Sequence, residues 1–222
     1  MKKTFLILLV LGLCINTIAQ EEIRLKQNNP DLAVNLGVGL WGMPIPVDYD
    51  GDGLMDILMT CPDTPYRGIY FFKNIGTSEN PFFAPAEKLT EKTFKNIQAS
   101  YANGKLSVMA PGIEYQNFTK ELFESPHKIE VDQKPGHDFT KIRSDMWSYV
   151  DFDDDGDLDI LVGVDDWGEY GWDNAYNEKG EWTNGPLRGF MYFLENKDGK
   201  YINKGKIYAG NKPLETFGAP GA

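Results

Sequence analysis

The chain has 222 residues, of which 33 are Asp or Glu and 22 are Lys or Arg, so its formal net charge is −11. Phosphate backbones repel a chain this acidic, which excludes nucleic acid as a partner bound through its phosphates. Aromatic residues make up 13% of the chain and 23 residues are glycine, a composition that favours a β protein with many turns.

The N-terminus has the features of a secretory signal peptide. Two lysines near the start precede an apolar run over Phe5–Leu13, and the small residue Ala19 stands before a polar one. The run is too short for a permanent membrane span. We therefore expect residues 1–19 to be removed and the remainder to be exported to the periplasm, the cell surface or the extracellular space. Cys14 offers a lipoprotein alternative, which the bulky residue before it disfavours.

Two nine-residue windows have carboxylates at positions 1, 3, 5 and 9 and glycine at position 6. Acids at alternate positions can wrap their oxygens around one Ca²⁺, and the glycine permits the sharp turn that returns the last acid to the ion. Backbone carbonyls at position 7 complete the predicted ligand sets, so we expect two Ca²⁺ sites. The first consists of Asp48, Asp50, Asp52, Leu54 and Asp56, and the second of Asp151, Asp153, Asp155, Asp157 and Asp159.

Two other interpretations of these windows are weaker. Mg²⁺ prefers few protein ligands and keeps its waters, so it is a poorer candidate than Ca²⁺. A purely solvated acidic turn would leave four carboxylates repelling one another in each window. Once the signal peptide is removed, Cys61 is the last cysteine, so bound metal can take the stabilising place of an internal disulfide.

The windows mark an internal repeat. Tyr49, Tyr101 and Phe152 are 52 and 51 residues apart, and each precedes a turn and an apolar strand, although the middle turn lacks acids. Short β-branched or aromatic runs bounded by turn residues predict four antiparallel strands per unit. Only Thr90–Ala99 could form a helical turn or two. The chain is therefore expected to be all-β, with about three β-propeller blades.

The windows resemble the FG-GAP or VCBS repeat, the calcium-loop blade of integrin α-chains and of many secreted bacterial proteins. The resemblance covers about residues 31 to 222, and it implies the fold and the metal rather than a function. Its units are expected at 31–92, 93–144 and 145–212, with an aromatic insertion at 165–188 in the third and a further blade beginning at 213–222. Three blades do not close a propeller, so we expect a fragment, or a chain that self-associates through open blade edges.

Propellers commonly bind ligands on the face opposite such loops. Aromatic side chains in a polar insertion suit stacking on sugar rings, so we expect a carbohydrate or another extracellular ligand there, glycan or protein. Three aromatic residues of the insertion should then be at least partly exposed on that face, namely Trp167, Tyr170 and Trp172. The candidate ligand-binding residues are Tyr66, Arg67, His137, Arg143, Trp167, Tyr170 and Trp172.

Two other functions remain open. The same face could belong to an enzyme, a polysaccharide lyase or a glycoside hydrolase, with catalytic residues unknown. A lyase needs a Tyr or His base and cations that neutralise a uronate carboxylate, which is why the Tyr, His and Arg candidates matter. The third possibility is a structural or adhesion module without a small ligand.

Overall fold

The computed structural model describes residues 26–27, 38–102 and 104–218, and almost all of the regular structure is β. The predicted signal peptide, Cys14 and the last four residues lie outside this range. No helix in the described part of the chain is long and apolar enough to cross a membrane.

Three antiparallel sheets follow one another along the chain. Their strands are, for sheet 1, β2 (Met43–Val47), β3 (Asp56–Cys61), β4 (Gly68–Phe72) and β6 (Glu87–Thr90); for sheet 2, β7 (Gln98–Ala102), β8 (Lys105–Ala110), β9 (Ile113–Tyr115) and β10 (His127–Lys128); and for sheet 3, β11 (Asp145–Val150), β12 (Asp159–Asp166), β13 (Leu187–Lys197) and β14 (Lys200–Lys206). Neighbouring strands in these lists are consecutive along the chain, except that β5 (Phe82–Phe83) lies between β4 and β6 in sequence, so most of the connections are hairpins.

The remaining elements are short. Strand β1 (Lys26–Gln27) pairs with β5 (Phe82–Phe83), and β15 (Tyr208–Ala209) pairs with β16 (Lys212–Pro213). The single described helix, α1 (Phe118–Glu121), was not expected, and the stretch considered helical at Thr90–Ala99 instead links β6 to β7.

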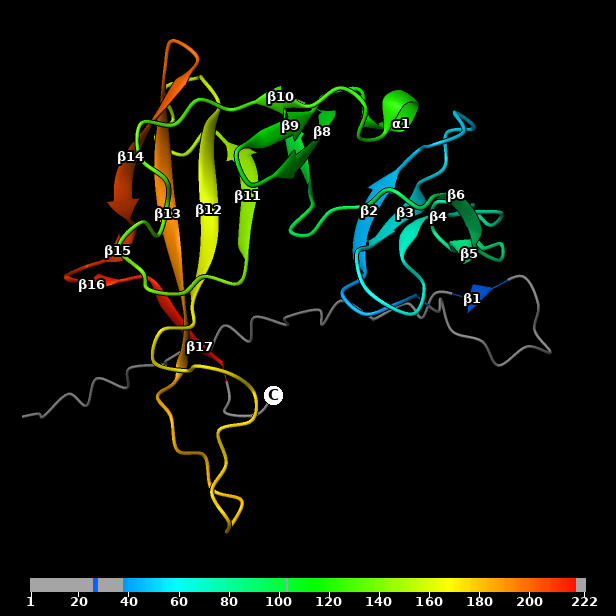
Figure 1. Cartoon of the computed structure of the whole chain (residues 1–222). Helices are drawn as coiled ribbons and strands as arrows, with labels where there is room; N and C mark the ends of the chain where they lie inside the picture. The colour runs from blue at the N-terminus through cyan, green and yellow to red at the C-terminus, as the bar shows by residue number, and fades with distance from the viewer. Residues whose placement is uncertain (1–25, 28–37, 103, 219–222) are drawn as a thin grey trace, which may run out of the picture.

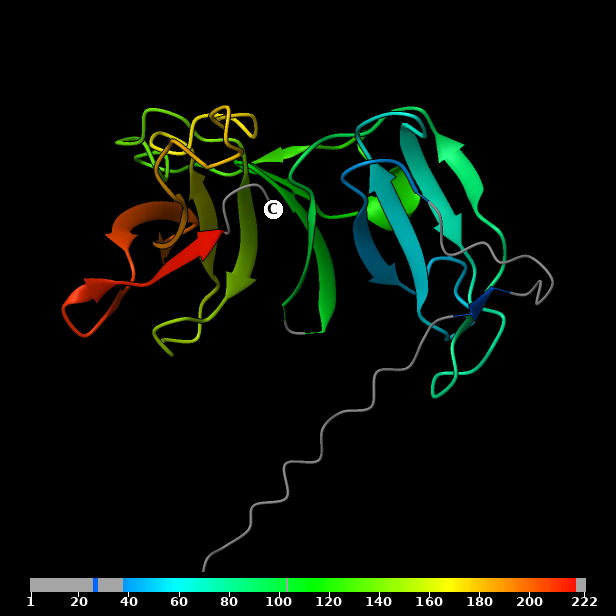
Figure 2. The ribbon, with the colours of Figure 1, turned by 90° about the horizontal axis from the view of Figure 1, so that it is seen from below.

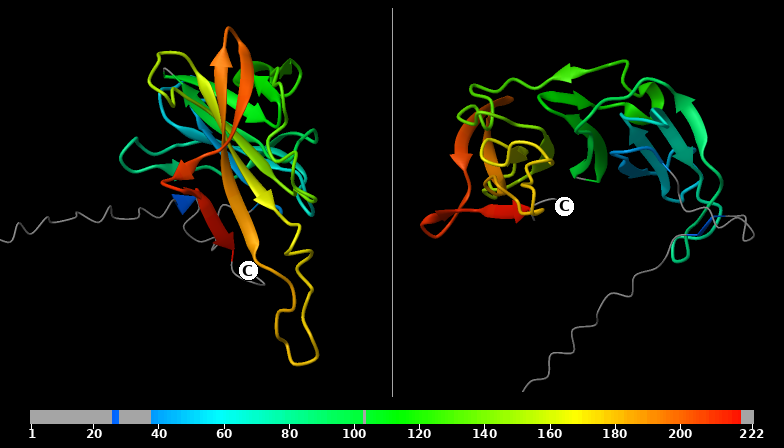
Figure 3. Two further views of the ribbon diagram at one scale, coloured as in Figure 1. Left: turned by 90° about the vertical axis from the view of Figure 1, so that its left-hand side faces the viewer. Right: turned by 60° about the horizontal axis from the view of Figure 1, so that its bottom comes forward.

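The three sheets stand side by side in an arc, with β2, β7 and β11 as the adjacent first strands (Figures 1 and 2). Ser100 on β7 accepts a hydrogen bond from the amide of Tyr149 on β11 at 2.8 Å, and the Tyr101 hydroxyl donates to the carbonyl of Pro46 on β2. The arc does not close into a ring (Figure 3).

Apolar side chains fill the space between neighbouring sheets. Successive strand residues point to opposite faces, so the buried neighbours Val108 and Met109 on β8 serve different cores. Val108 packs with Ile45 and Leu58 of sheet 1, whereas Met109 packs with Trp147 and other residues of sheet 3. Sheet 2 is therefore covered on both faces.

The end of the described chain differs from expectation. Residues 213–222 were expected to begin a further blade, but β17 (Glu215–Gly218) pairs antiparallel with β13 at Leu187–Phe190. Strand β14 pairs with β13 from Tyr192 onward, so β14 and β17 share one side of this long strand. Backbone groups left open by the shorter β14 thus receive partners within sheet 3.

Candidate metal centres

The first acidic loop (residues 48–56) joins β2 to β3, and the second (residues 151–159) joins β11 to β12. The pairs Val47–Asp56 and Val150–Asp159 close the two hairpins directly beneath the loops. Both loops lie at the same end of the sheets, the upper end in Figure 1. The register therefore returns the last acid of each window to its first.

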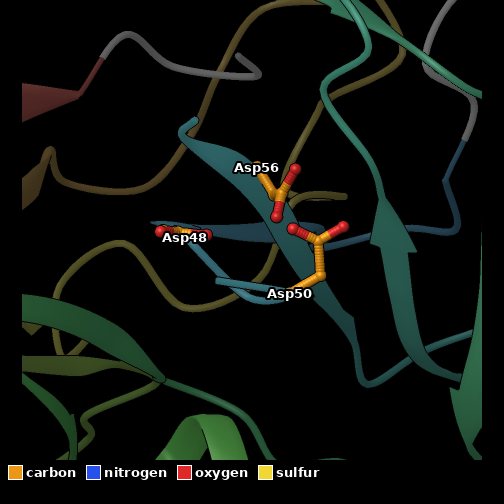
Figure 4. Close-up of side chains that lie close together, drawn as sticks. All are labelled: Asp48, Asp50 and Asp56. Carbon is orange, nitrogen blue, oxygen red and sulfur yellow. The ribbon is translucent and has the colours of Figure 1, made fainter. Parts of the chain in front are cut away.

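Each loop brings three carboxylates together. In the first, ligand oxygens of Asp48, Asp50 and Asp56 all lie within 4.8 Å of one another (Figure 4). In the second, Asp151, Asp153 and Asp159 meet the same limit. These are positions 1, 3 and 9 of the windows, so the chain places the same three ligands at both centres.

The last acid of the first loop is buried and fixed by backbone amides. Asp56 is 1% exposed. Its Oδ2 accepts a hydrogen bond from the Tyr49 amide at 3.0 Å, and its Oδ1 accepts one from the Asn74 amide at 2.7 Å. The Asn74 side chain in turn donates to the carbonyl of Met55. Two backbone amides thus hold the Asp56 carboxylate in one orientation.

The second loop repeats this arrangement. Asp159 is 1% exposed, and its oxygens accept hydrogen bonds from the amides of Phe152 at 3.0 Å and Asn196 at 2.9 Å. The Asn196 side chain donates to the carbonyl of Leu158. In both sheets an asparagine on the hairpin beyond the window thus clamps the last acid.

The loop backbones also match. Gly53 and Gly156, at position 6, have φ of 88° and 94° and donate their amides to Asp48 and Asp151 at 3.0 and 3.2 Å. These left-handed conformations explain the need for glycine, because a Cβ disfavours them. At position 4, Asp154 has φ of 63° where the first loop has a glycine at 78°.

In the part of the middle sheet that the structure describes, no acidic loop comparable to these two is present. Strands β7 and β8 pair as far as Ala102 and Lys105, and the turn between them contains no acid.

The acid at position 5 of each window lies outside the triad. Asp52 Oδ1 accepts the Leu54 amide at 3.0 Å, and Asp155 Oδ1 accepts the Asp157 amide at 3.1 Å. These carboxylates therefore shape the end of each loop. Metal ligation by them and by the Leu54 and Asp157 carbonyls stays a prediction.

Lys73, which directly follows β4, extends its side chain to the first acidic loop. The Lys73 ammonium contacts the Asp50 carboxylate and lies 2.9 Å from Asp52 Oδ2. Hydrogen bonds from Lys73 and from the Leu54 amide lower the pKa of Asp52, while the two carboxylates raise that of Lys73. The first loop thus carries its own positive charge.

The second loop has an acid at the corresponding place. Glu195 directly precedes Asn196, as Lys73 precedes Asn74. Partial desolvation, then Asp155 and Asp159, raise the pKa of Asp153, and the same causes raise that of Asp157. Asp157 Oδ1 is enclosed and has no hydrogen-bond partner among the described residues. Negative charge in this loop is therefore less compensated than in the first.

The donor set of both centres consists of oxygen, which suits a hard cation. No protein-family model, curated protein or solved structure matches the chain. The resemblance to FG-GAP repeats accordingly stays a prediction, and the candidate centres stand on the geometry of the two triads.

The aromatic insertion corrects one prediction. Trp167 and Tyr170 are 4% and 1% exposed, whereas Trp172 is 62% exposed. Tyr170 packs edge-on against Trp167 at 5.0 Å and stacks on Trp182 at 4.6 Å between ring centroids. Tyr170 is thus buried among rings of the insertion, whereas Trp167 is also covered by Arg143 from the segment before β11. Of the three residues expected to be exposed, only Trp172 is.

The position of the insertion agrees with expectation. It follows β12, which carries the chain away from the second acidic loop, and it lies at the lower end of Figure 1. Tyr66 and Arg67, on the β3–β4 connection, are exposed at that end of sheet 1, and His137 is exposed before β11. Among the described residues, no hydrogen bond, ion pair or ring contact joins these three to one another. Arg143 is different, since it contacts Trp41 and Trp167.

The sequence reasoning missed several residues at both ends. Asn74, Asn196 and Lys73 are not among the site residues predicted from the sequence. Asn74 and Asn196 share one signal in the sequence. Each is an asparagine near the end of the aromatic strand that follows the strand leaving an acidic window. Trp41 and Asn96 gave no local signal, because they reach Arg143 only through the packing of three sheets.

Proposed function

We propose that the chain is an exported module of the FG-GAP or VCBS β-propeller type that binds Ca²⁺ at its two acidic loops. The observation that carries this proposal is the matched pair of triads, each with a buried aspartate clamped by two backbone amides. Three converging carboxylates repel one another without a cation. Their oxygens, with loop carbonyls, supply the numerous ligands that Ca²⁺ prefers over Mg²⁺.

Calorimetric titration of chelator-treated, folded protein tests the metal. We expect close to two Ca²⁺ per chain and weaker competition by Mg²⁺. Asp153→Asn should remove one site and leave the other. Asp154→Asn is the matched control, because it lies in the same loop outside the triad and asparagine tolerates its left-handed backbone. Folded protein that takes up no Ca²⁺ would refute the proposal.

The second part of the proposed function is a ligand site at the end opposite the acidic loops. Carbohydrate is the favoured class, with a protein ligand as the alternative. The support is positional: the insertion and the β3–β4 connection lie at this end (Figure 1). Quenching of tryptophan fluorescence by a panel of acidic and neutral polysaccharides tests this part independently of the metal.

The enzymatic alternatives have less support. A lyase or hydrolase needs convergent acid–base groups, and geometry decides before pKa does. Tyr66 and Arg67 are exposed on the β3–β4 connection, whereas His137 is exposed on the segment before β11. Incubation of a bound polymer with the protein, followed by absorbance of an unsaturated uronate, would reveal lyase activity. A structural or adhesion role is the outcome if no saccharide binds.

We also propose that the protein is exported and that it self-associates through open sheet edges. Mass spectrometry of the protein recovered from an exporting host should find an N-terminus directly after Ala19. Sedimentation velocity over a range of concentrations should reveal association if open sheet edges pair between copies.

A further inference from the structure

A pocket of about 390 Å³ lies at the end of the sheets opposite the acidic loops. Its walls come from the beginnings of β2 and β11 and from the segments before β7 and after β12. Its lining includes Trp41, Met43, Asn96, Arg143, Met146 and Trp167. The pocket therefore lies where the three sheets converge, and its volume is in the range of small-ligand sites.

A guanidinium group is held at the centre of this lining. The Arg143 Cζ atom lies 4.4 Å from the ring centroid of Trp41 and 4.6 Å from that of Trp167. Contacts with two ring faces fix the guanidinium plane and leave its N–H edge for hydrogen bonding. Among the described residues, its only ion pair is with Asp173, at 3.6 Å. Donors of Arg143 thus remain available to a ligand.

Asp165 does not compete for these donors, because backbone and side-chain groups already occupy its carboxylate. Oδ1 accepts the amides of Arg143 and Ser144 at 2.9 and 2.7 Å. Oδ2 accepts the Ser144 hydroxyl at 2.9 Å and the Trp167 indole N–H at 2.5 Å. Asp165 is therefore a positioning residue that fixes Arg143 and Trp167 relative to each other.

More positive charge gathers on the neighbouring rings. The Lys95 ammonium lies 4.6 Å from the Trp41 centroid, and that of Lys141 lies 3.6 Å from the Trp172 centroid. In a chain of net charge −11, this end therefore presents three cations on three indoles. Carboxylates lie among these cations, since Asp165 lines the pocket and Asp173 pairs with Arg143. An anion at this end would therefore bind through direct contact with the cations rather than through the net charge of the region.

Asn96 lines the pocket, and its amide nitrogen lies 3.5 Å from Asp145 Oδ1. Its side-chain oxygen is enclosed and has no hydrogen-bond partner among the described residues. Asn96 and Trp41 have φ of 57° and 61°. A left-handed backbone is unfavourable for a residue as large as tryptophan, and such conformations cluster at binding sites.

We propose that this pocket binds a carboxylated sugar residue, a uronate, of an acidic saccharide. Arg143 receives the carboxylate in a bidentate pair, Lys95 adds positive charge, and Asn96 accepts a hydrogen bond from a sugar hydroxyl. Met43 and Met146 contact the apolar part of the ring. A simple fatty or aromatic carboxylate lacks the hydroxyl donor that Asn96 requires. The proposal rests on the second part of the proposed function, that this end binds a ligand.

Calorimetry with oligogalacturonate, and with the neutral oligogalactoside of the same length, tests the pocket. We expect binding of the acidic oligosaccharide and at least about tenfold weaker binding of the neutral one, since a lost charged hydrogen bond commonly has that effect. Arg143→Gln should weaken the acidic oligosaccharide at least about tenfold, and Arg143→Lys should not restore full affinity because lysine lacks the planar fork.

The controls separate binding from folding. Lys95→Gln changes an exposed side chain and should weaken binding without affecting the melting transition. Arg188→Gln is the matched control, because Arg188 pairs with Glu169 and Glu215 outside the pocket. Equal affinity for both oligosaccharides would refute uronate binding in this pocket, and so would an unchanged affinity of Arg143→Gln for the acidic oligosaccharide. Either result would still leave a ligand site at this end of the sheets. No binding of either would overturn the pocket, whereas Ca²⁺ uptake would still test the metal separately.

Discussion

Lys73 and Glu195 occupy equivalent places in sheets 1 and 3 and carry opposite charges. Each directly precedes the asparagine whose amide binds the buried aspartate of an acidic loop, Asp56 or Asp159. Lys73 contacts Asp50 and Asp52, whereas Glu195 pairs with Lys197 and Lys204 at 2.8 and 3.1 Å. The two carboxylate triads have the same geometry, but a lysine stands beside the first and a glutamate beside the second.

This difference predicts unequal cation affinities. A divalent cation at the first loop meets the Lys73 ammonium, so the second loop should bind Ca²⁺ more tightly. Lys73→Gln should tighten the first site by about three- to tenfold, an order-of-magnitude effect for one neighbouring charge near the surface. Calorimetry in an Asp153→Asn background isolates that site. Glu195→Gln in an Asp50→Asn background should weaken the second site, and an unchanged affinity in both variants would contradict the argument.

The buried aspartates should stabilise the fold even without metal. Asp56→Asn places an amide N–H₂ against one of two backbone donors, so we expect a loss of about 2–4 kcal/mol in the free energy of unfolding. Asp50→Asn, which alters a more exposed ligand of the same triad, should cost much less. Urea unfolding in the presence of a chelator measures both. Equal losses would mean that Asp56 acts only through a cation.

The insertion should depend on its own aromatic core. Trp167→Ala removes a buried ring that contacts Tyr170 and Arg143, and loss of a large buried aromatic commonly costs about 3–5 kcal/mol. We expect hydrogen exchange to rise across residues 167–185. Trp172→Ala, at a ring that is 62% exposed, should leave exchange in the insertion close to that of the unmodified protein. Similar exchange in the two variants would show that the rings do not form a core.

Ser100 should contribute to the contact between sheets 2 and 3. It is 2% exposed, and its hydroxyl accepts the Tyr149 amide at 2.8 Å. Ser100→Ala leaves that buried amide without its acceptor, so we expect destabilisation of about 1–3 kcal/mol by denaturant unfolding. Ser148→Ala is the control, because its hydroxyl meets only that of Ser100, at 3.4 Å, among the described residues. A larger loss in Ser148→Ala would contradict this assignment.

The sequence by itself determined the strands and the acidic loops. Strands β2 and β11 form from short runs that lead into the two windows, because β-branched and aromatic residues between turn signals are a local property. The triads were likewise predictable, since a nine-residue loop between paired strands brings its first and last residues together. Left-handed φ at Gly53 and Gly156 confirms why the windows contain glycine at position 6.

Only the tertiary structure decided which residues surround those loops and what lies at the other end. Lys73 and Glu195 reach the acidic loops through strand pairing across a further hairpin, so their opposite charges carry no signal within the windows. Trp167 and Tyr170 are buried because the insertion folds on itself, a choice that aromatic composition alone leaves open. Trp41 and Arg143 are about a hundred residues apart in sequence. Packing of separate sheets joins them, since burial of apolar surface rewards long-range contacts that no local pattern records.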